Sequence, residues 1–314
     1  MPQSKKDTAY QLSLAGFLIT ILGAVFFSTK AIFVKLAFKS TGVDAVTLLT
    51  LRMLFSLPFY LVAARMASKK ESAAAITKKD WLYLVLLGIF GYYLSSLFDF
   101  IGLQYISAGL ERLILFLYPT FSVLINSLVY KAKLNKTQIA ALVLTYVGIG
   151  VAYVGEMKID TSNPNFYFGS FMILLCAITY SFYLVGTGRM IPKVGVTRYT
   201  AYAMLAATIG IFLHFIFTKE IHEIPISSTL IGYSIALALI ATVLPSFLMS
   251  NGMKMIGSNN VSIIISIGPV STVIQAHFFL GEPIILPQLI GTILVIIGVL
   301  LIGWQWKRSS VEVV

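Results

Sequence analysis

Apolar runs of membrane-spanning length follow one another along nearly the whole chain of 314 residues. A helix needs about 20 apolar residues to cross the hydrocarbon core of a bilayer. Mean hydropathy is +0.90 and only 11% of the residues are charged, against about a quarter in soluble domains. The alternating segments of about 10 residues that mark a transmembrane β-barrel are absent from the sequence. We therefore predict an all-α integral membrane protein with about ten transmembrane helices, near 14–35, 46–65, 81–103, 108–129, 138–155, 167–187, 197–217, 228–249, 259–280 and 286–306.

The sequence also contains an internal repeat. The stretch from Gly102 aligns without a gap with the stretch from Gly252, an offset of 150 that matches Ile106 with Ile256 and Pro119 with Pro269. A second match at an offset of 153 pairs the run 16–28 with the run 169–181. Each half then holds five spans, and an odd number makes the second half enter the membrane from the opposite face. We predict two inverted-topology five-helix repeats, residues 14–155 and 167–306, an architecture associated with secondary transporters.

Basic residues indicate the orientation. With the N-terminus inside, sixteen Lys and Arg residues fall on the cytoplasmic side and only Lys39, Lys158 and Lys219 on the other. Basic residues concentrate in cytoplasmic loops. We expect both termini in the cytoplasm and the protein in the cell inner (cytoplasmic) membrane.

Several other classes of protein are disfavoured. The first apolar run is too long for a signal peptide and lacks a cleavage site. Cys176 is the only cysteine, which rules out an intrachain disulfide and a zinc cluster. No nucleotide-binding, zinc-protease or serine-hydrolase motif occurs, and the basic residues form no nucleic-acid-binding run. We predict no catalytic residue, no metal site and no cofactor, and no binding of nucleic acid.

Charged side chains inside the spans are the strongest functional candidates. Lys30, Asp99, Glu111 and Arg112 all fall toward the predicted outer end of the first half, and charges at membrane depth mark pathways or functional sites. One interpretation is ion pairing of the carboxylates with Lys30 and Arg112, which would staple three spans. The other is that a cation attracts a substrate carboxylate while a carboxylate carries a proton. Lys35 and Arg52 are expected only to extend to the membrane interface.

Polar and aromatic residues recur at helical spacing in five of the spans, which places them on one face of each helix. We expect these faces to line a central cavity suited to a small organic molecule. The predicted substrate-binding residues are Lys30, Tyr92, Ser96, Tyr118, Ser122, Asn126, Tyr180, Tyr183, Thr272 and Gln275.

Prolines and small residues predict local helix geometry. Prolines inside spans favour kinks, and they occur at Pro58, Pro119, Pro245 and Pro269. Small residues seven positions apart in the fifth and tenth spans, Ala141 and Gly148 with Gly291 and Gly298, favour close helix packing.

Three local motifs carry a family resemblance: Phe27-Ser28-Thr29-Lys30, the run from Gly109-Leu110-Glu111-Arg112 to Tyr118-Pro119-Thr120, and Leu280-Gly281-Glu282-Pro283. With them, the chain resembles the drug/metabolite transporter superfamily, in its EamA branch of ten-helix bacterial carriers. The resemblance implies an inner-membrane permease, commonly an exporter of amino acids or other metabolites, with spans five and ten at the periphery. The first half departs from the pattern, since Lys131-Ala132 stands where the second half has Gly281-Glu282.

The prediction is thus a secondary active transporter, not an enzyme, that exports a small polar or amphipathic, amino-acid-like metabolite by alternating access. Its partners would be a small-molecule substrate and the lipid bilayer, and it would act as a monomer or homodimer. An importer or exchanger of anionic metabolites such as sugar phosphates is the alternative. A membrane-embedded enzyme would need clustered acidic or histidine residues at one membrane face, and a sensor would be expected to carry a soluble domain.

Overall fold

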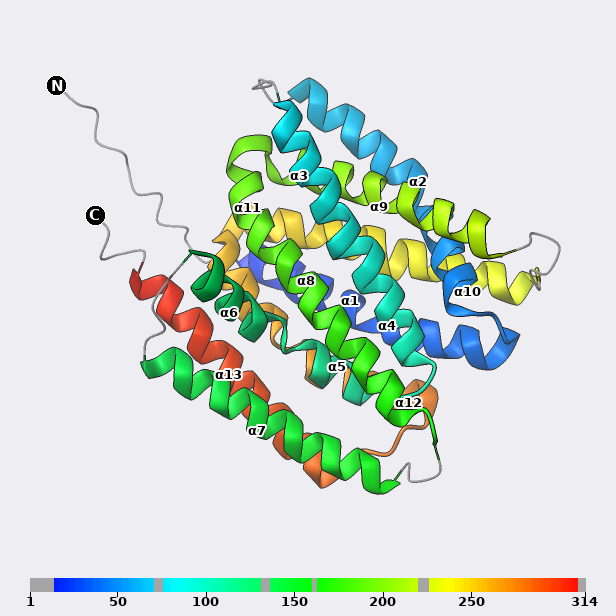
Figure 1. Ribbon diagram of the computed structural model, residues 1–314, viewed down its shortest axis with the longest axis vertical. Coiled ribbons are helices and arrows are strands. Elements are labelled where there is room, and N and C mark those ends of the chain that lie inside the picture. The colour runs from blue at the N-terminus through cyan, green and yellow to red at the C-terminus, as the bar shows by residue number, and fades with distance from the viewer. Residues whose placement is uncertain (1–13, 71–75, 131–135, 160–162, 220–225, 310–314) are drawn as a thin grey trace.

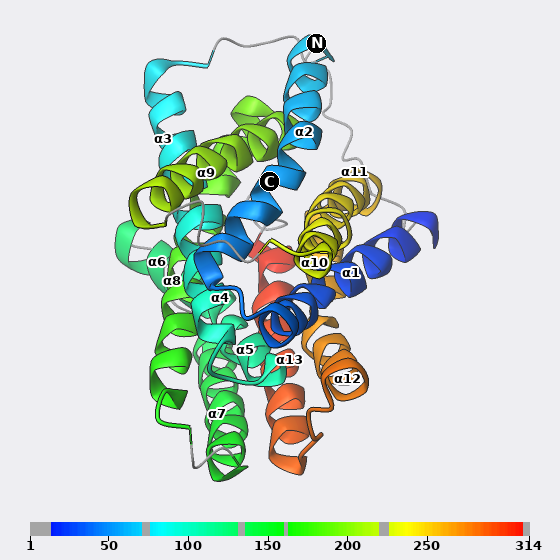
Figure 2. The same cartoon turned by 90° about the vertical axis from the view of Figure 1, so that its right-hand side faces the viewer.

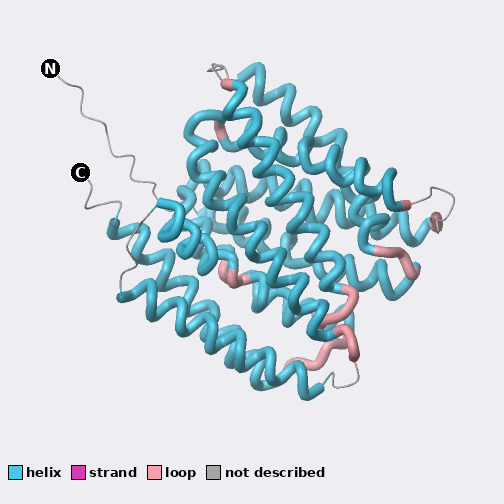
Figure 3. The backbone as a smooth tube through the Cα atoms, in the orientation of Figure 1, coloured by secondary structure: helices cyan, strands magenta, loops and turns pink. Residues whose placement is uncertain are grey.

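The computed structural model describes residues 14–70, 76–130, 136–159, 163–219 and 226–309, and their regular structure is helical throughout (Figures 1 and 3). The basic residues Lys5, Lys6, Lys131 and Lys133, and the Lys131-Ala132 pair, lie outside these ranges. The helices are α1 (Leu14–Thr41), α2 (Ala45–Lys70), α3 (Lys78–Gly88), η1 (Ile89–Leu94), α4 (Ser95–Leu103), α5 (Ala108–Leu115), α6 (Tyr118–Tyr130), α7 (Lys136–Ile159), α8 (Phe166–Val194), α9 (Val196–Thr218), α10 (Ser228–Ala238), η3 (Leu239–Val243), α11 (Leu244–Ile265), α12 (Gly268–Leu280) and α13 (Leu286–Ser309).

Within the described ranges, eight helical segments are long and apolar enough to cross a bilayer, and they coincide with the first eight predicted spans. A shorter apolar stretch, Leu286–Leu301, coincides with the tenth. Large apolar side chains such as Phe171, Ile216 and Phe217 are exposed on the outside of the bundle, as contact with lipid requires. The chain is therefore a multi-pass membrane protein.

The predicted boundary between the eighth and ninth spans is wrong. Helix α11 continues without interruption from Leu244 to Ile265, through the segment 250–258 where we expected a loop. Proline follows this segment only at Pro269, and glycine alone weakens a helix by about 1 kcal/mol without ending it. The ninth predicted span is thus divided between the end of α11 and α12.

Helices α6 and α12 each begin next to a proline. Pro119 is the second residue of α6 and Pro269 the second residue of α12, and a short break separates each helix from the preceding one, α5 or α11. Proline is tolerated in the first turn because its missing N–H would have no partner inside the helix. These two prolines therefore start helices, whereas Pro58 lies inside α2.

Two π-helical turns interrupt long spans. η1 begins at Ile89 and η3 at Leu239, positions 150 apart, and the helices that lead into them begin at Lys78 and Ser228. Pro245 follows η3 and lacks the N–H that a regular helix would use, and the Thr242 hydroxyl donates to the Leu237 carbonyl at 2.8 Å. The two stretches build the same local backbone features from different residues.

The longest helices cross between distant parts of the chain. α1 packs against α10, η3, α11 and α12, whereas α8 packs against α3, η1, α4, α5 and α6. α2 lies on α9, and α7 lies beside α13 at one edge of the molecule (Figures 1 and 2). The core is therefore made between the two halves of the sequence.

Close packing of α7 on α13 confirms the role predicted for the small residues. A Cβ on Gly148 would lie 2.8 Å from the Gly291 carbonyl oxygen, and one on Gly298 would lie 2.9 Å from that of Ala141. Only glycine allows backbones to approach this closely.

Candidate functional site

Three buried charged side chains meet between α1, α4 and α5. Lys30 Nζ lies 2.7 Å from Asp99 Oδ2 and 3.4 Å from Glu111 Oε1. Glu111 is 0% exposed, Asp99 1% and Lys30 8%. One ammonium group thus faces two carboxylates, and when both are ionised the group carries a net negative charge. A proton or another cation would neutralise it.

Arg112 follows Glu111 on α5 but lies in a different environment. Its guanidinium is 5.2 Å from the centre of the Phe27 ring and 5.4 Å from that of Phe116, and the residue is 3% exposed. Its Nε has no hydrogen-bond partner, and it forms no ion pair with any residue in the described ranges. Arg112 therefore does not form the ion pair with a carboxylate that one interpretation of the sequence predicted.

The start of α5 is held by a residue that the sequence analysis did not assign to the site. Both Glu282 carboxylate oxygens accept from the Ala108 N–H, at 2.9 and 3.1 Å, and one accepts from Gly109 at 3.4 Å. A carboxylate at a helix N-terminus satisfies free N–H groups and opposes the positive end of the helix dipole. Glu282 is positioned by Gly281, which ends α12 at a φ of +71° that favours glycine. The Gly-Glu-Pro motif was the available signal, but the partner is 174 positions away.

Lys35 and Arg52 differ from the expectation that both extend to the membrane interface. Arg52 is 6% exposed, donates from Nε to the Thr242 hydroxyl at 2.9 Å, and lies 5.5 Å from the Phe100 ring centre. Its hydrogen bond to η3 keeps it inside the bundle, so that prediction is wrong for Arg52. Lys35 donates to the Ile106 carbonyl at 2.6 Å and lies 3.6 Å from Glu282.

Tyrosines predicted to bind substrate form a connected group. The Tyr92 and Tyr183 hydroxyls are 3.0 Å apart, and the Tyr180 ring is in contact with those of Tyr118 and Tyr183, at 5.3 and 5.7 Å between centres. Tyr199, which the sequence analysis did not select, extends the group by stacking on Tyr183 at 5.9 Å. The structure thus brings together tyrosines from η1, α6, α8 and α9.

The other predicted residues lie on α4, α6 and α12. Ser122 uses its hydroxyl to donate to the Tyr118 carbonyl at 2.8 Å, and Gln275 donates to Ser271 at 2.8 Å. Ser96 and Asn126 are partly buried, whereas Thr272 is 0% exposed and its hydroxyl has no hydrogen-bond partner. These side chains stay candidates for a cavity that opens in another conformation.

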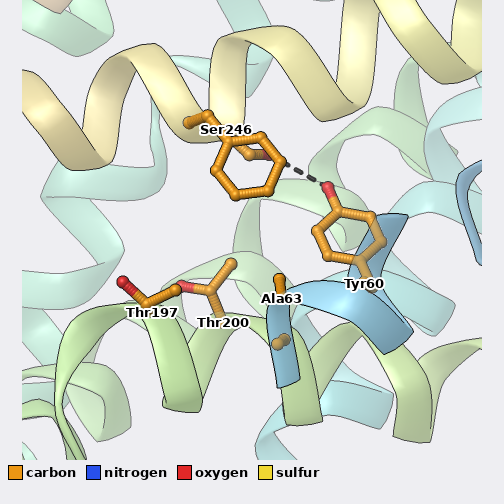
Figure 4. Close-up of a pocket in the computed structure, with 7 residues that line it drawn as sticks. Tyr60, Ala63, Thr197, Thr200 and Ser246 are labelled. Carbon is orange, nitrogen blue, oxygen red and sulfur yellow. Dashed lines mark hydrogen bonds between the residues drawn. The ribbon is translucent and has the colours of Figure 1, made fainter. Parts of the chain in front are cut away.

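A small pocket lies elsewhere, between α2, α9 and α11 (Figure 4). The Tyr60 hydroxyl lies 3.1 Å from the Ser246 hydroxyl at one side of it. Its lining residues are Tyr60, Ala63, Thr197, Thr200, Ala201, Ser246 and Phe247, none of which was predicted to bind substrate. We give more weight to the buried charges, because an uncharged surface hollow carries no comparable chemistry.

Comparisons with known proteins agree with the membrane fold. The chain is 28% identical to the uncharacterized transporter YcbK of Bacillus subtilis, over 92% of this chain and 93% of that protein. It is 22% identical to the uncharacterized inner membrane transporter YicL of Salmonella typhimurium, over 94% and 97%. A solved crystal structure shares the fold with a TM-score of 0.63 and 20% identity, over 91% of this chain and 94% of that one.

The model of the EamA-like transporter family matches residues 14–154 and again residues 167–304. These two matches take in the buried charges of α1, α4 and α5, the tyrosine group and Glu282. The chain belongs to the EamA-like transporter family.

Proposed function

We propose that this membrane transporter is a secondary active exporter of a small polar or amphipathic, amino-acid-like metabolite, working by alternating access across the cytoplasmic membrane. The observation that carries the proposal is the buried group of Lys30, Asp99 and Glu111 at the junction of three helices. Charges are costly at membrane depth and are retained where they bind ions, protons or substrates. The proposal assigns the protein transport and no catalysis.

Alternating access needs two halves that can rock about a shared site. We propose that residues 14–155 and 167–306 are two inverted five-helix repeats. Support comes from the π-helical turns and proline-started helices that recur 150 positions apart, and from the crossing of α1 and α8 onto the opposite half. Both termini would then be cytoplasmic.

Reporter fusions test this orientation. Fusions after Arg308 and in the loop between Lys69 and Lys79 should report the cytoplasm, and a fusion at Asn163 should report the outside. All three on one side would contradict the inverted repeat.

We further propose that Asp99 or Glu111 carries the coupling proton. Glu111 is the stronger candidate, because its nearer oxygen lies 3.4 Å from Lys30 Nζ against 2.7 Å for Asp99, so the lysine favours its ionised form less. In proteoliposomes, the Glu111→Gln protein should still bind substrate but lose acceleration by a proton gradient, with Asp99→Asn made alongside. Unchanged gradient dependence in both variants would leave these carboxylates a structural role only.

The substrate and direction are tested together. Purified protein is first screened by thermal shift against amino acids, nucleosides, sugar phosphates and cationic drugs, since a ligand at a hundredfold excess over Kd adds about 2.7 kcal/mol to native-state stability. Flux of the best ligand is then followed in oriented vesicles. Net outward movement supports export, and obligatory uptake or exchange of sugar phosphates would support the alternative instead.

A further inference from the structure

We infer that Arg112 and the start of α12 form an anion-binding subsite, and that the transported molecule carries a carboxylate which binds there. The inference builds on the proposed transport function and names the class of substrate. The buried cations differ in whether they already have an anionic partner.

Lys30 is not available for a substrate anion in this conformation. Its ammonium already contacts Asp99 and Glu111, at 2.7 and 3.4 Å. An added carboxylate would be the third negative group around one positive charge. Arg52 is only partly engaged: its Nε donates to the Thr242 hydroxyl, whereas its buried Nη1 has no hydrogen-bond partner.

Arg112 has no carboxylate partner in the part of the chain described, and unlike Arg52 its Nε donates to no side chain. The residue is only 3% exposed, yet its Nε makes no hydrogen bond. Its guanidinium is beside Phe27 and Phe116, which offer cation–π attraction but no anionic oxygen. Leaving a buried donor unsatisfied is destabilising, and more so for a charged group.

The start of α12 adjoins this guanidinium. A Cβ built on Gly268 would lie 2.5 Å from Arg112 Nη2, so the Arg112 side chain is directed at the first residue of the 13-residue helix α12. Ile267, at the N-cap position, provides no side-chain acceptor. The positive end of a helix dipole therefore lies next to a positive side chain, an arrangement that an anion would stabilise from both sides.

Thr272 is a further buried polar group of α12. It lies four positions after Gly268, about one turn along α12, is 0% exposed, and its hydroxyl has no hydrogen-bond partner. A guanidinium beside aromatic rings presents its donors in one plane, which matches the planar geometry of a carboxylate. The geometry thus favours a carboxylate over a neutral or cationic group.

Equilibrium binding tests the inference without relying on transport. The full-length protein in detergent is titrated with sodium acetate, with acetamide as the uncharged probe of the same shape and sodium phosphate as a tetrahedral anion. Acetate should raise the melting temperature of the wild type in a saturable way, and acetamide should not. Arg112→Gln should weaken acetate binding at least tenfold, and Arg112→Lys should weaken it less because the charge is kept but the fork is lost.

Two further variants keep the result interpretable. Arg52→Gln removes another buried guanidinium next to a phenyl ring and should leave acetate binding within twofold of the wild type. Gly268→Ala puts a methyl group where Arg112 Nη2 lies and should weaken acetate binding while the charge stays, which covers the case that Arg112→Gln does not fold.

The outcomes are distinct. No acetate binding by the wild type, equal acetate binding by Arg112→Gln, or stabilisation by phosphate and not acetate would each overturn the inference. Acetate binding that depends on Arg112 supports it even if proteoliposomes show no flux, a result that would count against the proposed transport function alone.

Discussion

Residues 78–130 and residues 228–280 share their local backbone features but differ in their charges. Both stretches begin a helix after a hydroxyl cap, Thr77 or Ser227, pass through a π-helical turn, and start their last helix next to a proline. Positions 150 after Asp99, Glu111 and Arg112 hold Met249, Val261 and Ser262. The charges are therefore not required for these three shared features. The stretches still differ in one respect, since α4 and α5 are separated by residues 104–107 and α11 is continuous.

The same contrast applies to α1 and α8. Lys30 on α1 corresponds to Tyr183 on α8, 153 positions later. Lys30 is held by two carboxylates, whereas Tyr183 is held by one hydroxyl and by ring contacts with Tyr180 and Tyr199. A neutral aromatic residue can be buried with little penalty, but a lysine needs its partners. Substitutions in each stretch test whether this difference in charge matters for stability and binding.

The largest effect is expected from Lys30→Gln. The change leaves Asp99 and Glu111 buried without a cation, and breaking a buried ion pair on one side costs about 3–5 kcal/mol. The free energy of unfolding in mild detergent should fall by about that amount. Adding Asp99→Asn should recover a substantial part of the loss, because one uncompensated charge is removed.

A double-mutant cycle of these two substitutions also separates stapling from substrate binding. Strong coupling in stability with unchanged ligand affinity would falsify a substrate-contacting role for Lys30. A change in ligand affinity with little loss of stability would instead place Lys30 in the binding site.

A smaller effect is expected where the halves meet through glycine. In Gly291→Ala, the new methyl group would meet the Gly148 carbonyl oxygen and lie 2.7 Å from the Ala152 Cβ, so α7 and α13 would have to separate. Overpacking of this kind costs about 1–3 kcal/mol. Gly150→Ala is the matched control, since nothing lies within 4 Å of its Cβ position, and alanine should be neutral or stabilising there. Equal stability of the two variants would show that the glycine contact is not needed.

Sequence reasoning located most of the helices and the charged residues inside them because both follow local rules. Apolar runs located eight of the segments, and the charges in 81–103 and 108–129 stood out against their neighbours. The continuous helix α11 was missed because Gly252 and Gly257 resemble a loop, yet neither ends a helix as proline does.

The sequence alone could not show which side chains pair with one another. Which carboxylates surround Lys30 depends on how α4 and α5 cross α1, and neighbours 69 and 81 positions apart leave no local signal. Glu282 was visible as part of a motif, but its role at the start of α5 needed the tertiary structure. Arg112 next to Glu111 suggested a pair, whereas adjacent helix residues point in different directions.

Glu282→Gln tests this long-range contact at the start of α5. The amide oxygen of glutamine can still accept from the Ala108 N–H, but the substitution removes the negative charge that faces the helix end and Lys35. We expect a loss of about 1–2 kcal/mol in the free energy of unfolding. Asp80→Asn, which weakens the exposed contact with Lys193, is the control and should have the smaller effect. A larger loss in the control would mean that the Glu282 contact does not anchor α5.

The smallest effect is expected from Tyr183→Phe, at the position that corresponds to Lys30. Phenylalanine keeps the stacking with Tyr180 and Tyr199 and removes only the hydroxyl that lies 3.0 Å from that of Tyr92. A single uncharged hydrogen bond contributes about 0.5–1.5 kcal/mol, so stability should fall by no more than that. Substrate affinity measured beside stability then decides what the tyrosine does. A loss of binding free energy well beyond the loss of unfolding free energy would make Tyr183 a binding residue. Equal and small changes in both would leave the second half a neutral counterpart whose rings support the charged helices of the first.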